Sequence, residues 1–286
     1  MGTILEITLV ANDPARAHAL IERCFAETAR LEMIFTTWRE DGELARLNAK
    51  AGQGPQPASP ELIWILKDAQ RLARETDGAF DVTVGPLVSL WRDAGKLGTR
   101  PNDAEIAATR ARVGAERIQI DAVRGTIALE AGMSVDLGGL AKGWALDRLG
   151  EVLRRERVDR ALLNFGGSSL LAMGTPLDAP NWRVALQHGE LLDLQPETDV
   201  SISSSFGQFV EIDGARFSHI IDPRTGWPTR RARRAIVEAP DGAIAEAWST
   251  ALVVVNGDKE CAKSGENFFA MPTRGGAING RVGCNP

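Results

Sequence analysis

The dipeptide Asp213–Gly214 constrains the fold of this chain more than any other short stretch of its 286 residues. It separates two segments of alternating apolar and polar residues, 208–212 and 216–221, and an Asp-Gly pair in that position predicts a tight β-hairpin. Strands that come in pairs, among long helices rather than in strict alternation with them, favour an α+β fold with a mixed sheet. The chain length allows one large domain or two closely joined subdomains of helices and strands.

Periodicity in the rest of the chain predicts where the other elements lie. Residues 3–10 alternate as a half-buried strand does, and a helix follows in which Asp13 caps the N-terminus and Pro14 takes the first turn. A second helix begins in the same way at Ser59–Pro60 and ends at Asp77–Gly78. The remaining predicted elements are a loop at 52–60, helices at 102–113, 140–155 and 243–255, and strands at 117–121, 126–130, 161–165, 182–187 and 200–204.

Composition limits the partners of this chain. The net charge is −5 and the hydrophobic and charged shares are 44% and 25%, which is typical of a globular protein and gives no basic surface for nucleic acid. The one basic cluster, 230–234, is interpreted as a solvated turn. Three scattered cysteines are too few for a disulfide framework or a thiolate zinc site.

No segment of the sequence predicts a membrane span or an export signal. Apolar runs stay shorter than about 18 residues, and the residues after Met1 alternate like a strand instead of forming the apolar part of a signal peptide. We therefore expect a cytoplasmic location for the chain as written. The alternative is the periplasmic face of the inner membrane, if an export or lipoprotein segment is missing ahead of Met1.

Two glycine-rich turns flank the helix predicted at 140–155. The first, 136–143 (DLGGLAKG), places two glycines and Lys142 ahead of an apolar helical run, where backbone N–H groups and the lysine charge suit an anion. Its spacing matches neither a P-loop nor a dinucleotide-binding fingerprint, and a simple turn followed by a surface lysine is the alternative. The second turn, 164–169 (NFGGSS), ends a predicted strand and allows the same two interpretations.

His219 and the pair Glu246 and Thr250 are further candidate site residues. One of three histidines, His219 lies on the second hairpin strand, ahead of the turn-forming Asp222–Pro223. Its imidazole could act as a general base or form a local hydrogen bond. Glu246 and Thr250 are four residues apart on one face of the last predicted helix, and their oxygens suit Mg²⁺. An exposed glutamate beside a helical threonine is the alternative.

The segment 76–86 (TDGAFDVTVGP) carries more glycine, proline, aspartate and aromatic residues than a simple link between two elements needs. Residues 79–81 could form a wall for an aromatic ligand together with Trp38 and Met1, offering apolar surface to a ring and polar groups to its edge. Trp38 could equally belong to the core.

Taken in order, these stretches resemble the ApbE family, the FAD:protein FMN transferases. The resemblance rests on MGT at the start, FTTWREDGELARLN, TDGAFDVTVGPLV, DLGGLAKGWALD, NFGG, SHIIDPRTGWP and AEAWSTAL, and it covers residues 1–252. This ordered set is far more specific than any one of its motifs. It implies an ApbE-like fold with the flavin site between two subdomains, a transferase domain at 1–257, and a divergent C-terminal tail at 258–286 without a recognisable strand.

The resemblance also implies an activity. Members of the family are expected to use Mg²⁺ while they transfer FMN from FAD to a threonine or serine hydroxyl of an acceptor protein. The acceptor carries a short Ser/Thr-Gly-Ala-Thr motif, a phosphoester forms, and AMP is released. Two other activities stay open, namely FAD pyrophosphatase, in which water replaces the acceptor hydroxyl, and FAD binding with little catalysis.

The same resemblance assigns roles to the candidate residues. It implies that His219 is the base for the acceptor hydroxyl and that Lys142 holds phosphate with the glycine turn. The family's usual metal-binding aspartate is Glu246 here, and 202–204 (ISS) replaces a Thr-Ser-Gly turn. The implied flavin contacts are Met1, Trp38, Ala79, Phe80, Asp81, Asp136, Lys142, His219 and Ile220, and the implied Mg²⁺ ligands are the Gly139 carbonyl, Glu246 and Thr250.

Overall fold

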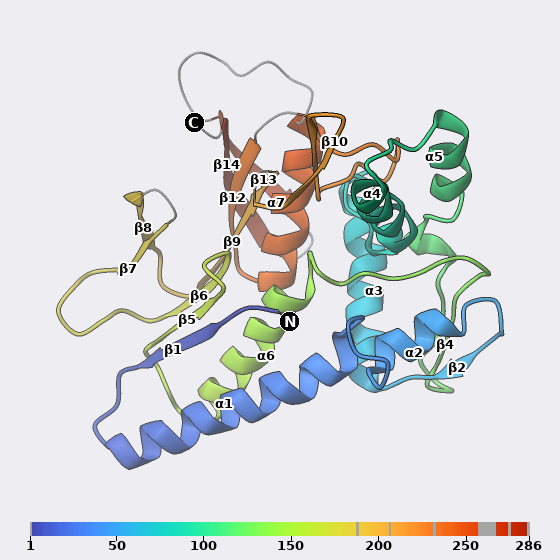
Figure 1. Cartoon of the computed structure of the whole chain (residues 1–286). Helices are drawn as coiled ribbons and strands as arrows, with labels where there is room; N and C mark the ends of the chain where they lie inside the picture. The colour runs from blue at the N-terminus through green and yellow to red at the C-terminus, as the bar shows by residue number, and fades with distance from the viewer. Residues whose placement is uncertain are drawn as a thin grey trace.

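An antiparallel sheet forms the centre of the fold (Figure 1). The computed structural model describes residues 2–186, 189–205, 207–230, 233–256, 267–273 and 276–284. Within these residues the sheet has seven strands in the order β1-β5-β6-β9-β12-β14-β13. Their bounds are Leu5–Leu9 (β1), Ala161–Phe165 (β5), Ser169–Met173 (β6), Thr198–Ser204 (β9), Arg233–Ala239 (β12), Asn267–Thr273 (β13) and Gly276–Cys284 (β14).

Every pair of neighbouring strands in this sheet is antiparallel, from β1 against β5 to β14 against β13. The expected α+β class is confirmed, whereas the expectation of a mixed sheet is wrong. Smaller sheets pair the remaining described strands, which are β2 (Gln56–Pro57), β3 (Gln119–Asp121), β4 (Thr126–Ala128), β7 (Trp182–Ala185), β8 (Leu191–Leu194), β10 (Phe209–Ile212) and β11 (Ala215–Ser218).

The hairpin predicted around Asp213–Gly214 is confirmed. β10 pairs with β11, with Ile212 opposite Ala215, and the two turn residues have φ angles of 51° and 72°. A tight two-residue hairpin needs such positive φ angles, because they match the right-handed twist of the strands. β11 ends at Ser218, so His219 lies in the segment after the strand and not on it, which corrects the prediction.

Local sequence signals set the helix ends. Asp13 accepts a backbone N–H bond of 3.0 Å at the start of α1, and Pro14 opens that helix, as predicted. Ser59 caps α3, and Asn102 forms a capping box with Glu105 at α5. The described helices are α1 (Pro14–Phe35), α2 (Glu43–Ala49), α3 (Pro60–Glu75), η1 (Val82–Val84), α4 (Gly85–Leu97), α5 (Asp103–Arg110), η2 (Ala115–Arg117), α6 (Ala141–Arg155) and α7 (Gly242–Asn256). Among them, no helix has the length and apolarity needed to cross a bilayer.

Helices cover one face of the sheet and a β-ribbon covers the other. In β6, Leu171 belongs to the main core, whereas its neighbours Leu170 and Ala172 join a second cluster with residues of β7 and β8. Successive strand residues point to opposite faces, which explains why all five residues of β6 are buried. On the helical face, α7 packs on β9 and β12 and against α6.

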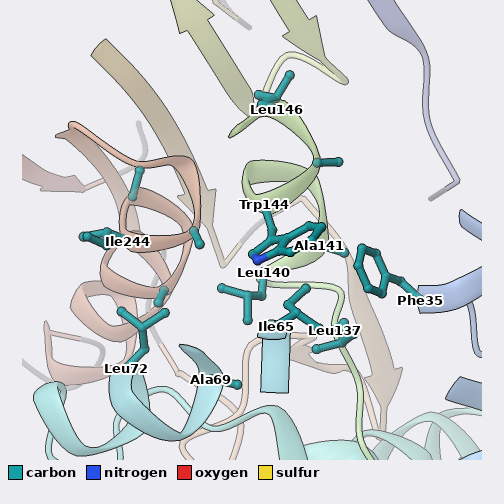
Figure 2. Packing of buried hydrophobic residues seen from close by; sticks show 14 of the residues in the cluster. Phe35, Ile65, Ala69, Leu72, Leu137, Leu140, Ala141, Trp144, Leu146 and Ile244 are labelled. Carbon is teal, nitrogen blue, oxygen red and sulfur yellow. The ribbon is translucent and has the colours of Figure 1, made fainter. Parts of the chain in front are cut away.

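The main core fixes the glycine-rich stretch ahead of α6. Leu137 and Leu140 are 2% and 0% exposed. Figure 2 shows them near Ile65 of α3, with Trp144 of α6 facing Phe35 of α1. The two rings meet edge to face with their centroids 5.4 Å apart. The glycine turn between the two leucines is therefore anchored at both of its ends.

Helix α4 is not predicted from the sequence because of the residues that precede it. The β-branched run Val82–Val84 is typical of a strand, yet it forms the short helix η1. Asp81 caps this helix, because its Oδ1 accepts the Thr83 N–H at 2.7 Å. Gly85–Pro86 then opens α4, and proline in a first turn is a helix-start signal. Helix α2 and the strands β2, β6, β8 and β12 are also additions to the prediction. Because β12 begins at Arg233, the interpretation of 230–234 as a solvated turn is wrong for its last two residues.

The C-terminal residues complete the central sheet, which corrects the expectation of a tail without a recognisable strand. β14 pairs with β12, with Cys284 opposite Arg233, and β13 adds the outer strand. Ile278 and Val282 are buried in the main core. Glycines interrupt β14, so its sequence lacks the regular alternation of apolar and polar residues that predicts a strand.

Buried acids gather where α6, α7 and β9 meet. The Asp147 carboxylate accepts the N–H groups of Gly242 at 2.8 Å and Ala243 at 3.2 Å, and thereby caps α7. Asp199 on β9 is 4% exposed, and its Oδ1 has no hydrogen-bond partner in the part of the chain that the structure describes. Burial first, and then repulsion from neighbouring acids that include Asp241, raises the pKa of both Asp147 and Asp199 well above 3.8.

Asp199→Asn is expected to stabilise the protein at neutral pH. A carboxyl whose pKa is raised on folding contributes stability that is fully present below about pH 3.8 and is lost as the pH rises through the folded-state pKa. An amide does not ionise, so the variant keeps the stability that the carboxyl loses as the pH rises. The Tm at pH 7.5 should therefore rise by about 2–4 °C, which is the shift that a gain of about 1 kcal/mol in the free energy of unfolding produces in a chain near this size. Thermal unfolding of the variant and the wild type from pH 4 to pH 8 measures this, with the exposed Asp178→Asn as control. A Tm difference that does not grow with pH would contradict the assignment.

Candidate active site

The N-terminus of α6 offers a place for an anion. Asp136 shapes the turn before it, because its N–H donates to the Val82 carbonyl at 2.7 Å and its Oδ1 accepts the Gly138 N–H at 2.7 Å. α6 begins at Ala141 with no side-chain cap and with no acidic residue in its first turn. The first N–H groups of a helix lack partners within the helix, and they and the helix dipole suit phosphate. The geometry favours the anion interpretation over a simple turn.

Close contact between the backbones of α6 and α7 brings the two helices of the site together. A Cβ atom added to Gly143 would lie 2.1 Å from the Gly242 carbonyl oxygen, and one added to Gly242 would lie 2.6 Å from the Gly143 oxygen. Only glycine at both positions allows this approach. The contact places Lys142, which precedes Gly143, against the side of α7.

Glu246 on α7 is a buried carboxylate, 2% exposed. The Lys142 Nζ lies 2.8 Å from its Oε1, and the Ser169 hydroxyl donates to the same oxygen. Its Oε2 is buried and has no partner among the described residues. A buried acceptor without a partner costs free energy, and a bound cation would remove that cost. The alternative of an exposed glutamate is therefore wrong.

Thr250 and Gly139 lie side by side next to Glu246. A Cβ atom added to Gly139 would be 3.5 Å from the Thr250 Oγ1, and Thr250 follows Glu246 by about one turn of α7. The Ser203 hydroxyl of β9 lies 3.2 Å from the Thr250 Oγ1 and 2.7 Å from the Ser249 Oγ. The structure thus brings the predicted metal ligands to one place, with the Ser203 hydroxyl holding the threonine.

These residues fit Mg²⁺ with part of its coordination shell open. They supply one unpartnered carboxylate oxygen on Glu246, the Thr250 hydroxyl and the backbone at Gly139. In the described ranges, no group of three or more His, Cys, Asp or Glu side chains could hold a metal ion. Mg²⁺ commonly keeps several waters and takes oxygens from one or two carboxylates and a substrate phosphate. The donor set therefore suits a cation that binds together with a phosphate.

His219 presents a basic ring nitrogen. Its Nδ1 lies 2.8 Å from the Gln208 carbonyl, and because a carbonyl only accepts, Nδ1 carries the hydrogen and Nε2 is the basic nitrogen. Desolvation by the surrounding protein, and then the nearby Lys142 charge, lower the pKa of the ring from 6.5, although the bond to Gln208 opposes them and the residue is exposed to solvent. A lowered pKa favours the neutral imidazole that a general base requires.

The predicted flavin-contact residues divide into exposed and buried ones. Trp38 is 84% exposed, which excludes the alternative that it belongs to the core. Ala79 and Phe80 are buried, and the Phe80 ring lies 3.4 Å from where a Cβ atom of Gly139 would be. Ile220 is buried directly after His219. Met1 lies outside the described residues, and the assignment of these residues to flavin stays a prediction.

The side chain of Asp81, a predicted flavin contact, bonds other parts of the protein instead. Its Oδ1 accepts from the backbone and hydroxyl of Thr83 at 2.7 and 2.6 Å, and its Oδ2 accepts from the Ala115 N–H at 2.9 Å. Burial outweighs these hydrogen bonds and raises the pKa of the carboxyl above its usual range. The side chain therefore joins η1 to η2, and the backbone of 79–81 is the part that could contact a flavin.

Sequence reasoning did not assign a role to Ser169 or Ser203. Each lies in a strand beside α7, and each hydroxyl contacts a predicted metal ligand, Glu246 or Thr250. Ser169 opens the otherwise apolar strand SLLAM, and a hydroxyl in such a strand is the one signal that could have indicated a buried polar partner.

Comparisons with known sequences match almost the entire chain. The model of the ApbE family matches residues 1–267. An FAD:protein FMN transferase of Klebsiella pneumoniae (strain 342) is 33% identical over 274 residues, which cover 91% of this chain and 77% of that protein. An FAD:protein FMN transferase of Treponema pallidum (strain Nichols) is 29% identical over 285 residues and covers 92% of this chain and 78% of that protein.

Solved structures share the fold. The ApbE protein from Thermotoga maritima superposes with a TM-score of 0.80 at 26% identity, covering 90% of this chain and 85% of that one. The flavin transferase ApbE from Vibrio cholerae gives a TM-score of 0.74 at 27% identity, with 98% and 93% of the two chains covered. The similarity therefore extends over nearly all of each molecule.

Proposed function

This chain belongs to the ApbE family, and we propose that it is an FAD:protein FMN transferase that attaches FMN to a serine or threonine hydroxyl of an acceptor protein. The observation that carries the proposed chemistry is the orientation of His219, whose Nδ1 is held by the Gln208 carbonyl at 2.8 Å and whose Nε2 is left as the basic nitrogen. Its basic Nε2 belongs to the same site as Lys142 and the open N-terminus of α6. A base beside a phosphate-binding helix end suits transfer of a phosphoryl group to a hydroxyl.

In the proposed reaction one phosphorus–oxygen bond forms, another breaks, and one proton moves. The acceptor hydroxyl oxygen bonds to the FMN phosphorus while the phosphorus–oxygen bond to AMP breaks. The hydroxyl proton passes to Nε2 of His219, and AMP leaves with the bonding electron pair. The Ala141 N–H already donates to the Leu137 carbonyl at 2.8 Å, so the Lys142 side chain and the next N–H groups of α6 hold the pyrophosphate oxygens and stabilise their charge. Positioning and charge supply most of the catalysis in such a transfer.

Mg²⁺ is the proposed metal, held by Glu246, Thr250 and the backbone of Gly139. When bound, it supplies positive charge to the pyrophosphate oxygens. The buried Oε2 of Glu246, which has no partner in the described structure, supports this assignment. Lys142 has three donors and only one of them is engaged with Glu246, so the ammonium can contact the carboxylate and a phosphate together.

Ser169→Ala is expected to weaken Mg²⁺ binding by about tenfold, because loss of an outer partner that orients a ligand typically has an effect of this order. The Ser169 hydroxyl holds Oε1 of Glu246 and so leaves Oε2 as the oxygen that would bind a cation. Calorimetric titration of Mg²⁺ into the chain with bound AMP measures the affinity without turnover. Ser168→Ala, in the same turn, is the matched control and should bind Mg²⁺ like the wild type. Equal affinities for all three proteins would show that Ser169 does not position the carboxylate.

One incubation tests the proposed activity against its alternatives. The chain is mixed with FAD, Mg²⁺ and an acceptor protein that carries a Ser/Thr-Gly-Ala-Thr segment, and the acceptor mass and free nucleotides are measured. An acceptor that gains the mass of FMN, with an equal amount of AMP, supports transfer. Free FMN and AMP without a labelled acceptor would instead indicate FAD pyrophosphatase. FAD that stays intact would leave a flavin-binding protein and overturn the proposal.

A further inference from the structure

The side chain of Asn48, in α2, bonds the backbone directly ahead of the glycine-rich turn. Its Nδ2 donates to the Val135 carbonyl at 2.8 Å, and its Oδ1 accepts the Val135 N–H at 2.8 Å. One carboxamide thus satisfies both polar groups of one residue, as the opposite residue of an antiparallel strand would. These bonds join two segments that are 87 positions apart in the chain.

The bonds from Asn48 fix the start of the turn that holds Asp136. Val135 is 1% exposed, so its N–H and carbonyl have little access to water and depend on protein partners. On the next residue, the Asp136 N–H donates to the Val82 carbonyl at 2.7 Å, and the Asp136 Oδ1 accepts the Gly138 N–H. Val135 and Asp136, which we call the junction, are therefore held by α2 on one side and by η1 on the other.

Each element that holds the junction is attached to a predicted flavin segment. Val82 directly follows residues 79–81, and α2 directly follows the link 36–42, which contains Trp38. The turn that begins with Asp136 is the third predicted segment. All three segments therefore meet at the junction, and the Asn48 side chain makes the connection on the side of the link.

The link between α1 and α2 is attached closely to α2. The Arg46 side chain of α2 donates to the Asp41 carbonyl of the link at 2.8 Å. A Cβ atom added to Gly42 would lie 2.9 Å from the Thr36 carbonyl oxygen, so the two ends of the link are in contact. A shift of α2 would therefore move the link as a unit, together with the exposed ring of Trp38.

Directional bonds matter for α2 because the helix is short. It has seven residues, and Gly42 at its N-terminus offers no side-chain cap. Leu44 and Leu47 are buried in the main core and hold the helix by apolar contact. Apolar contacts have no preferred direction, whereas two hydrogen bonds of 2.8 Å fix both the distance and the orientation of the groups that they join.

We propose that Asn48 is a positioning residue of the FAD site, which aligns the link that contains Trp38 with the turn that contains Asp136. The inference rests on the proposed function, since it concerns the site where FAD binds. The Asn48 carboxamide acts through the Val135 backbone, to which both its oxygen and its nitrogen are bonded. The position requires one donor and one acceptor, and an asparagine amide presents both in one planar group.

Asn48→Ala tests the proposal by removing both bonds. The FAD Kd should rise by about tenfold, because even a small misplacement of the groups that form a site has a large effect on it. Flavin fluorescence measures the Kd at a temperature well below the unfolding transition, and thermal unfolding of the same samples measures the Tm. An FAD Kd equal to that of the wild type would overturn the inference.

Asn102→Ala is the matched control, because it makes the same substitution at a residue outside the predicted flavin segments. The Asn102 Oδ1 caps α5 by accepting the Glu105 N–H at 2.9 Å, so its loss also lowers the Tm. The FAD Kd of this variant should stay within about twofold of the wild type, since the effects of distant sites are independent. An equal rise of the FAD Kd in both variants would assign Asn48 to general stability and overturn the positioning role.

Asn48→Asp keeps the shape of the side chain and makes its donor depend on pH. A carboxylate accepts the Val135 N–H but has no hydrogen for the Val135 carbonyl, whereas the protonated acid has one. The FAD Kd of this variant, divided by that of the wild type at the same pH, should be about ten at pH 8 and should fall about threefold or more by pH 5. A ratio that does not change with pH would show that the bond to the Val135 carbonyl does not position the site.

FAD binding separates this inference from the proposed function. It requires neither an acceptor nor turnover, so the role of Asn48 can be measured even if the chain hydrolyses FAD instead of transferring FMN. Failure of the proposed transfer appears in the acceptor mass alone. A wild type that binds no FAD would overturn both, and an unchanged FAD Kd in Asn48→Ala would overturn the inference only.

Discussion

Replacing His219 by alanine is expected to lower the rate of flavin transfer by about 10²–10⁴-fold, the usual contribution of a general base, while the FAD Kd stays within about twofold. The imidazole holds its Nδ1 hydrogen on the Gln208 carbonyl and offers Nε2 to the acceptor hydroxyl. Alanine removes the proton acceptor and leaves Lys142, Glu246 and the α6 N-terminus in place. Single-turnover labelling of an acceptor by preloaded enzyme measures the loss, and flavin fluorescence measures FAD binding.

The pH profile gives a second test of the same residue. Because desolvation and the Lys142 charge lower the pKa of His219, the fall of kcat/KM for transfer on the acidic side should have its midpoint below pH 6.5. His18→Ala, an exposed histidine on α1, is the matched control and should keep both rate and profile. Unchanged turnover in His219→Ala, or an acidic limb that persists without the imidazole, would remove His219 from proton transfer.

Signals within a few residues of one another predicted much of the fold. Caps at Asp13 and Ser59 and the Asp213–Gly214 turn each stabilise one local conformation, and all three occur as predicted. The elements that the sequence did not predict lie where contacts between distant residues decide the structure. Val82–Val84 has strand-forming residues but becomes helical because Asp81 caps it and ties it to Ala115. β14 is a strand because it pairs with β12, a partner that its glycine-rich sequence does not reveal.

The candidate site could be predicted in its residue types but not in its internal contacts. Spacing on one helix placed Glu246 and Thr250 together, and the glycine-rich turn placed Lys142 at a helix start. The ion pair between Lys142 and Glu246 and the hydroxyl of Ser169 depend on how α6, α7 and β6 pack. Such contacts join residues far apart in the sequence, so no local pattern encodes them.

Gly143→Ala is expected to destabilise the protein by about 3 kcal/mol or more and to lower the transfer rate by about 100-fold, because displacing catalytic groups by even about 1 Å can have that effect. Helix propensity alone predicts the opposite sign, since alanine favours a helix by about 1 kcal/mol over glycine. The new methyl group would lie 2.1 Å from the Gly242 carbonyl oxygen, and backbone atoms cannot rotate away from it. α6 and α7 must separate, which moves Lys142 and Gly139 away from Glu246 and Thr250.

Three measurements locate the effect of that separation. Thermal unfolding reports the loss of stability, calorimetry reports a weaker Mg²⁺ affinity, and acceptor labelling reports the rate. Gly207→Ala is the control for unfolding, because an added Cβ atom there would come no closer than 3.9 Å to another atom. A wild-type Tm in Gly143→Ala would show that the helices are not in close contact at this point. A lower Tm with unchanged Mg²⁺ affinity and rate would show instead that the spacing of α6 and α7 stabilises the fold without setting the geometry of the site.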